Sequence, residues 1–240
     1  TTLVGEIFKN AGYETYVNGN IGDAFINDAA KGDENSVYSL EISSYQLEMT
    51  DKFKPNVAII TNITPDHLER HGSFEEYVRV KGNVFLNQDE NDYLIVNKED
   101  NVVMELSKKA KSNVLTFTTK DDKDANAYLE NENIMINFKG EVFELININK
   151  LKLYGLHNVM NVMCASLAGI VKGVKKESLV NTLENFKSVE HRIEYVDTVD
   201  GIEYINDSKG TNVDATVTAI KAMKKKTVLM LGGYDKQTPF

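Results

Sequence analysis

The chain has 240 residues, 42% of them hydrophobic, and this length suits one large domain or two smaller domains with their own cores. Its net charge of −9 argues against the basic stripe that nucleic-acid binding needs, so we expect no nucleic-acid partner. No stretch approaches the roughly 18 apolar residues of a membrane span, and no signal-peptide pattern opens the chain. We therefore expect no membrane partner and a cytoplasmic location.

The first half of the chain alternates helical and extended patterns. The chain opens with a helical pattern over residues 1–12. Strands are predicted at 36–43, 56–63, 92–97 and 113–119, and helical patterns lie between them at 22–32, 73–87 and 101–110. Such alternation is typical of parallel β-α units in which helices cover both faces of the sheet. We therefore expect an α/β fold with a mostly parallel central sheet and flanking helices.

This alternation stops at segment 127–149. The segment is predicted to form short strands with a turn at Lys139-Gly140, which would add antiparallel strands to the sheet. Two helical patterns follow, at 157–173 and 175–186. The only cysteine, Cys164, lies in the first of these apolar patterns, so we predict a core residue in a protein of a reducing compartment.

A second β-α series begins after these helices. A hairpin signal centres on Asp200-Gly201, a helix is predicted at 212–224, and a strand is predicted at 227–233. We predict a central domain at 1–188 and the first part of a second, Rossmann-like domain at 189–240. Both ends of the chain resemble cuts within a longer protein, so we expect exposed apolar surface on the isolated chain.

Polar residues follow the first two predicted strands. The residues at the end of the first strand are Glu41, Ser43, Ser44 and Gln46, and those at the end of the second are Asn62, Thr64, Asp66 and His67. Ligands of open α/β sheets bind beyond the carboxyl ends of the strands. Glu41 and His67 could therefore meet as an oxygen ligand and a nitrogen neighbour of Mg²⁺. Alternatively, a turn begins at Asp66 and His67 is a surface or capping residue.

Further single residues have two interpretations each. Lys81 could be functional, or it could belong to a solvated helix face. Its spacing alone favours the solvated face. Asn158 and Asn161, at positions i and i+3, could hydrogen-bond a flat heterocycle or cap a helix. Arg192 could reach phosphates and Lys236 an anionic ligand, or both could be ordinary surface residues.

The segment INDSKGTN, residues 205–212, places an acid, a hydroxyl and an amine at three consecutive positions, Asp207, Ser208 and Lys209. By itself the segment fits a solvated turn in which the first two side chains bind local backbone donors. It also fits a ligand-binding loop at a strand end. The choice depends on the rest of the chain.

The segments TTLVGE, GNIG, LEISSYQLE, NITPDHLERH, YVRVKGN, GLHNVMN, HRIEYV, INDSKGTN and LMLGG occur in this order along the chain. Together they resemble the ATP-dependent Mur ligases, and NDSKGTN and SSYQLE are most similar to the D-glutamate-adding members. The resemblance implies a UDP-substrate domain, a central ATPase with a P-loop, and a Rossmann-like C-terminal domain. By this resemblance the P-loop would precede residue 1, so we expect the 240 residues alone to be inactive.

The resemblance also implies an amide ligation. ATP would phosphorylate the carboxylate of UDP-N-acetylmuramoyl-L-alanine, and the amine of D-glutamate would attack the resulting acyl phosphate. Glu41 and His67 would hold Mg²⁺, and Lys81 would react with CO₂ to become a carbamylated metal ligand. His67, Lys81 and Lys209 would be the catalytic residues.

The remaining implied residues would bind the three substrates. Those that would bind ATP are Asn161, Arg192, Asp207 and Lys209. Those that would lie near the peptide end of the UDP-sugar are Asn20, Ser43 and Gln46, and those that would bind D-glutamate are Thr211 and Lys236.

Two other functions remain open from the sequence. One is a related ligase that adds another amino acid or acts on folate. The other is a nucleotide-binding module that has lost catalysis. For the D-glutamate-adding ligase and for both alternatives, we expect a monomer.

Overall fold

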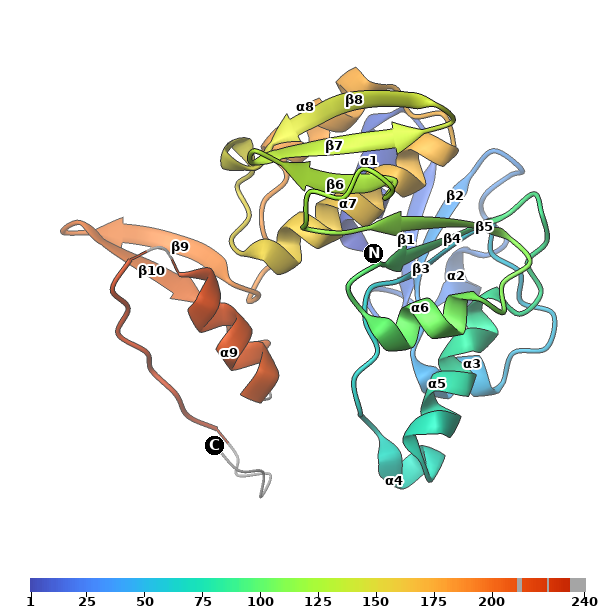
Figure 1. The fold of residues 1–240 in the computed structure, drawn as a ribbon. Helices are drawn as coiled ribbons and strands as arrows, with labels where there is room; N and C mark the ends of the chain where they lie inside the picture. Colours follow the sequence, from blue (N-terminus) through green and yellow to red (C-terminus); the bar gives the residue numbers. More distant parts are fainter. Residues whose placement is uncertain (211–212, 224, 234–240) are drawn as a thin grey trace.

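The computed structural model describes residues 1–210, 213–223 and 225–233. Figure 1 shows an α/β protein whose helices flank a central sheet, as predicted. The helices of the first part are α1 (Thr2–Asn10), α2 (Phe25–Asp28), α3 (Ser44–Glu48), α4 (Leu68–His71), α5 (Phe74–Gly82) and α6 (Asn101–Ser107). Short 3₁₀ turns follow at Asn83–Phe85 and Ile148–Lys150, and the later helices are α7 (Leu156–Val171), α8 (Lys176–Asn185) and α9 (Val213–Ala222).

The main sheet has six strands in the order of the sequence. They are β3 (Val57–Ile60), β4 (Tyr93–Asn97), β5 (Asn113–Phe117), β6 (Ala127–Glu130), β7 (Asn133–Phe138) and β8 (Glu141–Asn147). The pairs from β3 to β6 are parallel, and β6, β7 and β8 pair antiparallel. The predicted antiparallel addition and its turn are confirmed, since both Lys139 and Gly140 have the positive φ angles of a tight hairpin.

Hydrophobic cores cover both faces of this sheet. In β4, Leu94 and Val96 face a core that includes residues of α5 and α6, whereas Ile95 faces the larger core with α1, α7 and α8. This alternation follows from the two-residue period of a strand, and both faces are buried as in other parallel sheets. Cys164 of α7 is a core residue as predicted, and burial raises the pKa of its thiol to about 11.

A separate pair of parallel strands, β1 (Thr15–Gly19) and β2 (Val37–Glu41), packs against α1. The two strands approach each other closely at their carboxyl ends, where a side chain at Gly19 would collide with the Glu41 carbonyl. The amide of Asn20 then donates to that same carbonyl at 2.7 Å. The end of β2 is thereby held beside the GNIG segment.

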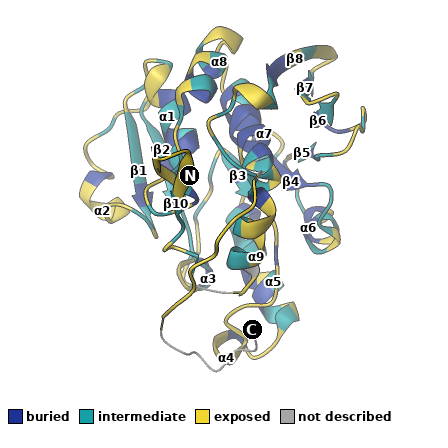
Figure 2. Ribbon diagram, turned by 90° about the vertical axis from the view of Figure 1, so that its left-hand side faces the viewer, coloured by how far each residue is buried: buried dark blue, intermediate teal, exposed yellow. Residues whose placement is uncertain are grey.

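The last described elements are the antiparallel hairpin β9 (Glu194–Val199) and β10 (Ile202–Asn206), followed by α9. The hairpin turns at Asp200-Gly201 as predicted, with a positive φ angle at both residues. In Figure 1 these elements stand apart from the main sheet. Figure 2 shows that buried residues concentrate in the main body, whereas the segment after α9 is exposed.

Two sequence predictions were wrong in extent or type. Residues 225–233 form no strand, so the strand predicted at 227–233 is absent from the described part of the chain. A strand needs a hydrogen-bonded neighbour, and none of the described strands pairs with this segment. The helix predicted at 22–32 is only the single turn α2, because the glycine and polar residues around it favour turns. Among the described residues, no helix has the length and apolar character to cross a membrane.

Candidate functional site

The polar residues at the end of β2 lead into the short helix α3, which is capped at its start. Ser43 is the N-cap of α3: its hydroxyl accepts from the Gln46 amide, and its own amide donates to the Gln46 side chain at 2.9 Å. This reciprocal pair satisfies two backbone donors that would otherwise lack partners. Ser43 and Gln46, both predicted substrate residues, therefore also have a structural role. Glu41 precedes them and accepts a hydrogen bond from the Thr1 hydroxyl at 3.3 Å.

His67 follows β3 and stands at the start of α4 in the left-handed conformation, with φ of 52°. Its amide donates to the Asp66 carboxylate at 2.9 Å, which stabilises a backbone conformation that is rare for a residue other than glycine. Its ring Nδ1 lies 3.5 Å from the Tyr45 hydroxyl of α3. The two strand ends predicted to converge are therefore joined by the contact between Tyr45 and His67.

Lys81 lies in α5 with its amine half-buried, 5.4 Å from the centroid of the Tyr77 ring. Burial lowers the pKa of Lys81, because a charged amine is poorly solvated there. The Asp66 and Glu41 carboxylates act in the opposite direction, which places both of them near the amine. Of the two interpretations of Lys81, the half-buried amine does not fit a fully solvated helix face.

This cluster has the donor types that Mg²⁺ prefers, although it is not a preformed ligand cage. No group of three or more His, Cys, Asp or Glu side chains in the described ranges is arranged to hold a metal. The charges of Asp66 and Glu41 nevertheless both act on the Lys81 amine. Hard oxygen ligands suit Mg²⁺, which binds few protein groups and retains several waters. The residues present therefore fit such an ion if the amine of Lys81 becomes an anion.

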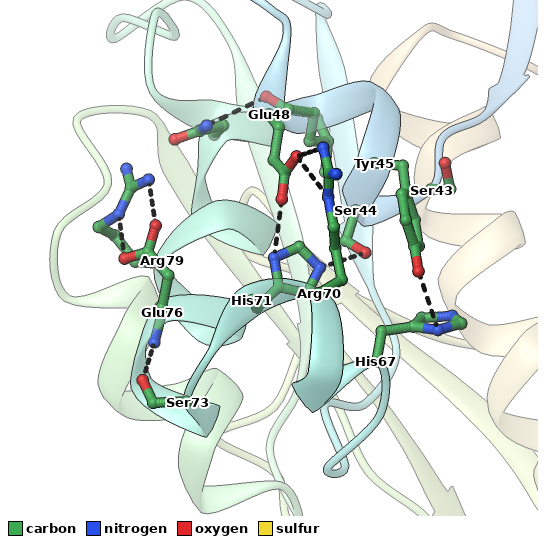
Figure 3. A network of polar contacts seen from close by, with 12 residues as sticks. Ser43, Ser44, Tyr45, Glu48, His67, Arg70, His71, Ser73, Glu76 and Arg79 are labelled. Carbon is green, nitrogen blue, oxygen red and sulfur yellow. Dashed lines mark hydrogen bonds and ion pairs between the residues drawn. The ribbon is translucent and has the colours of Figure 1, made fainter.

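A network around the buried His71 ring, not predicted from the sequence, joins α3 and α4 (Figure 3). The His71 ring Nε2 lies 3.0 Å from the Ser44 hydroxyl, and its Nδ1 lies 2.9 Å from a Glu48 carboxylate oxygen. The contact with Glu48 is within ion-pair distance but is not aligned as a hydrogen bond. Arg70 donates to the other Glu48 oxygen at 2.8 Å, and this bond lowers the pKa of Glu48.

A second cluster forms around the start of α7. The Asn161 side chain donates to Asn158 at 3.2 Å, and Asn158 donates to the Tyr154 carbonyl at 2.8 Å. The i, i+3 spacing therefore places both amides on one helical face, as predicted. Asn161 is exposed, and its carboxamide can meet a ligand at this end of the helix.

Two segments of the second predicted domain, 191–193 and 207–209, are joined by hydrogen bonds. The Ile193 amide donates to the Asp207 carboxylate at 3.0 Å, and the Lys209 amide donates to the His191 carbonyl at 3.0 Å. The first segment is strained, since His191 and Ile193 both have positive φ angles. Asp207 and Lys209 therefore hold the backbone on the two sides of Arg192, Asp207 at Ile193 and Lys209 at His191.

The first segment, 191–193, faces the start of α7. Burial lowers the pKa of His157; Arg192 acts in the same direction, and Asp207 opposes it, so both side chains lie near this imidazole. Ala222 of α9 lies so close to Gly155 that a side chain at Gly155 would meet it at 2.8 Å. The structure thus brings Arg192, Asp207 and the asparagine face of α7 together.

The predicted site residues fall into two groups. Glu41, Ser43, Gln46, His67 and Lys81 gather around the ends of β2 and β3. In the second group, Asn161 lies near the start of α7, and Arg192, Asp207 and Lys209 belong to the segments that flank the hairpin of β9 and β10. Asn20 is exposed beside the first group. The two residues expected to bind D-glutamate, Thr211 and Lys236, lie outside the described residues.

This chain is similar to a known protein family and to several curated proteins. Residues 1–169 match the family model described as the Mur ligase middle domain. The UDP-N-acetylmuramoylalanine–D-glutamate ligase of Thermoanaerobacter sp. (strain X514) is 44% identical over 240 residues, covering 100% of this chain and 53% of the relative. The ligase of the same name from Clostridioides difficile (strain 630) is 40% identical with the same coverage. The chain thus spans about half the length of these curated relatives.

Solved structures show the same fold at low sequence identity. MurF from Acinetobacter baumannii superposes with a TM-score of 0.72 and 17% identity, over 94% of this chain and 51% of the other. MurF ligase from Thermotoga maritima, solved in complex with ADP, gives a TM-score of 0.67 and 18% identity, over 92% and 54%. At this identity the likeness supports the fold alone.

Proposed function

This chain belongs to the Mur ligase family, and we propose that it is the middle part of an ATP-dependent ligase that adds D-glutamate to UDP-N-acetylmuramoyl-L-alanine during peptidoglycan precursor synthesis. The observation that carries the proposal is the 44% identity along the whole chain to a ligase of that name. The match spans both clusters, so it favours this amino acid over those of the sister ligases.

The reaction couples two steps that are each feasible. A carboxylate resists attack by an amine, so ATP first transfers its terminal phosphoryl group to the L-alanyl carboxylate, giving an acyl phosphate and ADP. The D-glutamate amine then attacks the acyl carbon, and phosphate leaves with one oxygen of the original carboxylate. Phosphoryl transfer depends chiefly on positioning and on cationic groups that offset charge on the transferred oxygens.

The first cluster would hold Mg²⁺ through Glu41, His67 and a modified Lys81. When bound, the ion would neutralise phosphate charge and align the phosphate oxygens. Burial favours the neutral amine of Lys81. Its nitrogen lone pair can then bond to the carbon of CO₂ and lose a proton, forming a carbamate anion. That modification would replace a cation between two carboxylates with an oxygen ligand.

The second cluster would bind ATP, and its geometry supports this role. Asn161 would meet the adenine from the exposed face of α7, and Asp207 would accept hydrogen bonds from the ribose hydroxyls. Arg192 and Lys209 would offset phosphate charge, with the guanidinium giving bidentate contacts. The charges of Arg192 and Asp207 both act on His157 at the start of α7, which supports one shared site.

The remaining proposed contacts concern the two other substrates. Asn20, Ser43 and Gln46 would lie near the peptide end of the UDP-sugar, and Thr211 and Lys236 would bind the D-glutamate carboxylates. Residues 189–240 would belong to a domain that closes on the central domain at 1–188 and excludes water from the acyl phosphate. We place the enzyme in the cytoplasm as a monomer.

Phosphate release by the full-length product of the gene tests this function. The assay contains ATP, Mg²⁺ and UDP-N-acetylmuramoyl-L-alanine, with D-glutamate, L-glutamate, L-lysine or no amino acid. Release that requires D-glutamate is the expected result. Release with another amino acid would indicate a sister ligase, and no release in any mixture would favour a nucleotide-binding module without catalysis.

A further inference from the structure

His71 lies at the centre of a buried network that the proposed function does not use. Its side chain is fully buried, and its ring contacts the two ends of one short helix. Nε2 meets the hydroxyl of Ser44, the first residue of α3, at 3.0 Å, and Nδ1 meets a carboxylate oxygen of Glu48, the last residue of α3, at 2.9 Å (Figure 3). One imidazole therefore holds both ends of α3 against α4.

The order Ser44, His71, Glu48 resembles the relay of a serine hydrolase, but it cannot act as one in this fold. A nucleophilic hydroxyl must reach a substrate carbonyl. Ser44 is only 2% exposed, and Glu48 is shared with Arg70. The arrangement is therefore structural in its contacts, and its effect must pass through the residues that it positions.

The ring contacts of His71 lead to both candidate metal residues. On one side, its centroid is 5.9 Å from that of Tyr45, which in turn lies 5.1 Å from the ring of His67. On the other side, its centroid is 5.3 Å from that of Tyr77, and the Lys81 amine lies 5.4 Å from the Tyr77 ring. His71 is thus the midpoint of a row of rings between His67 and Lys81.

The His71 ring also contacts α3, the helix that is capped by Ser43 and contains Gln46, two proposed substrate residues. Ser43 caps α3 directly before Ser44, and its capping partner Gln46 lies in the middle of the helix. A helix with so few residues has little stability of its own and depends on its tertiary contacts. Its position relative to α4 therefore depends on the contacts that His71 and Arg70 make with it.

We propose that His71 is a positioning residue of the ligase site: by joining Ser44 and Glu48 of α3 to α4 and by packing between Tyr45 and Tyr77, it sets the distance between the metal-binding and UDP-sugar-binding side chains. This inference rests on the proposed function of the cluster around Glu41. Groups that orient metal ligands from behind typically change metal affinity or activity by about 10- to 100-fold when they are replaced.

The test uses the full-length product of the gene and four variants. His71→Ala removes all contacts of the ring, His71→Asn retains an amide that can reach Glu48, and Ser44→Ala removes one partner. Ser166→Ala is the matched control, because Ser166 is buried in α7 and its hydroxyl has no hydrogen-bond partner in the described part of the chain. Calorimetric titration with Mn²⁺ measures metal binding without turnover, and steady-state kinetics give KM for each substrate.

His71→Ala is expected to weaken Mn²⁺ binding by about 10-fold or more and to raise KM for UDP-N-acetylmuramoyl-L-alanine, with KM for D-glutamate unchanged. His71→Asn should recover part of both losses, Ser44→Ala should show a smaller loss, and Ser166→Ala should match the wild type. A uniform fall in kcat with every KM and the Mn²⁺ affinity unchanged would overturn the inference, because it indicates only loss of folded protein.

The metal titration separates this inference from the proposed function. A wild-type protein that binds Mn²⁺ but never turns over D-glutamate would refute the function, and the inference would then be judged by the Mn²⁺ affinities of the variants. A wild-type protein that binds no Mn²⁺ under any condition would refute the inference itself.

Discussion

The amine of Lys81 lies 5.4 Å from the centre of the Tyr77 ring, in a half-buried position. Burial is the largest influence on its pKa and lowers it, whereas Asp66 and Glu41 only partly restore it. A lysine in such a place costs folding free energy in its charged form. The proposed carbamate chemistry would use the neutral amine that this burial favours.

Replacing Lys81 by methionine should separate stability from activity. Below the lowered pKa of Lys81, the folded state carries a poorly solvated charge, so Lys81→Met should melt at a higher temperature near neutral pH in CO₂-depleted buffer. Because the folded state binds fewer protons than the unfolded state, this gain should shrink as the pH rises toward the ordinary lysine value of about 10.4. The variant should release no D-glutamate-dependent phosphate.

Thermal unfolding of the full-length protein at several pH values measures this effect. The control is Lys109→Met, because Lys109 is an exposed lysine of the same predicted central domain. A melting temperature for Lys81→Met below that of the wild type at neutral pH would show that the amine stabilises the fold.

Asp207 makes one structural contact and has a proposed role in ATP binding, and two substitutions can distinguish them. Its carboxylate accepts from the Ile193 amide, and Ile193 is 4% exposed, so Asp207→Ala leaves a buried donor without a partner. We expect a loss of about 1–3 kcal/mol in the free energy of unfolding for this variant. Asp207→Asn keeps an acceptor oxygen and should unfold nearly as the wild type does. Both variants should raise KM for ATP; denaturant titration and ATP kinetics check the two effects. An unchanged KM for ATP in Asp207→Asn would exclude the ribose role.

His157 should add a pH dependence to stability. Burial and Arg192 lower its pKa from the ordinary value of about 6.5. Between the lowered and the ordinary pKa the unfolded state binds more protons, so stability is full above about 6.5 and falls as the pH decreases. His157→Gln cannot titrate, so the difference between wild type and variant should grow only below that value. Urea unfolding at a series of pH values measures it, and parallel curves would contradict the assignment.

The isolated chain of 240 residues should be poorly cooperative or aggregate on heating. Val228 and Met230 are 93% and 89% exposed, and the outer residues of β9 and β10 are also apolar and exposed. Contiguous apolar surface of this kind promotes association. Replacing both residues by serine should increase the recovery of soluble protein after heating, measured by light scattering. A single sharp, reversible transition for the unaltered chain would refute the expectation.

Much of the fold was predictable because its signals are local. The apolar runs that became β4 and β5 are bounded by turn residues, and the helix α7 has a long apolar period, so their type followed from pattern alone. The strand β1 was not predicted, since Thr15–Gly19 contains few apolar residues and depends on pairing with β2. The prediction of a strand at 227–233 was wrong for a related reason: none of the described strands lies beside this segment to pair with it.

The candidate site was predictable only where residues are close in sequence or match a family motif. The capping pair of Ser43 and Gln46 and the amide face of Asn158 and Asn161 follow from short spacings. The contact between Ser44 and His71 joins positions 27 residues apart and depends on how two short helices pack. Ser44, Glu48 and His71 lie within the motif segments LEISSYQLE and NITPDHLERH, but nothing in those segments indicated that the three side chains contact one another.

The acyl phosphate is the central claim of the proposed mechanism, and an isotope label tests it most directly. UDP-N-acetylmuramoyl-L-alanine is prepared with heavy oxygen in the alanyl carboxylate and incubated with the full-length protein, ATP, Mg²⁺ and D-glutamate. Mass spectrometry should find one heavy oxygen in the released phosphate, because phosphate leaves with an oxygen of the original carboxylate. Phosphate that contains only ordinary oxygen, formed alongside the amide product, would contradict the mechanism.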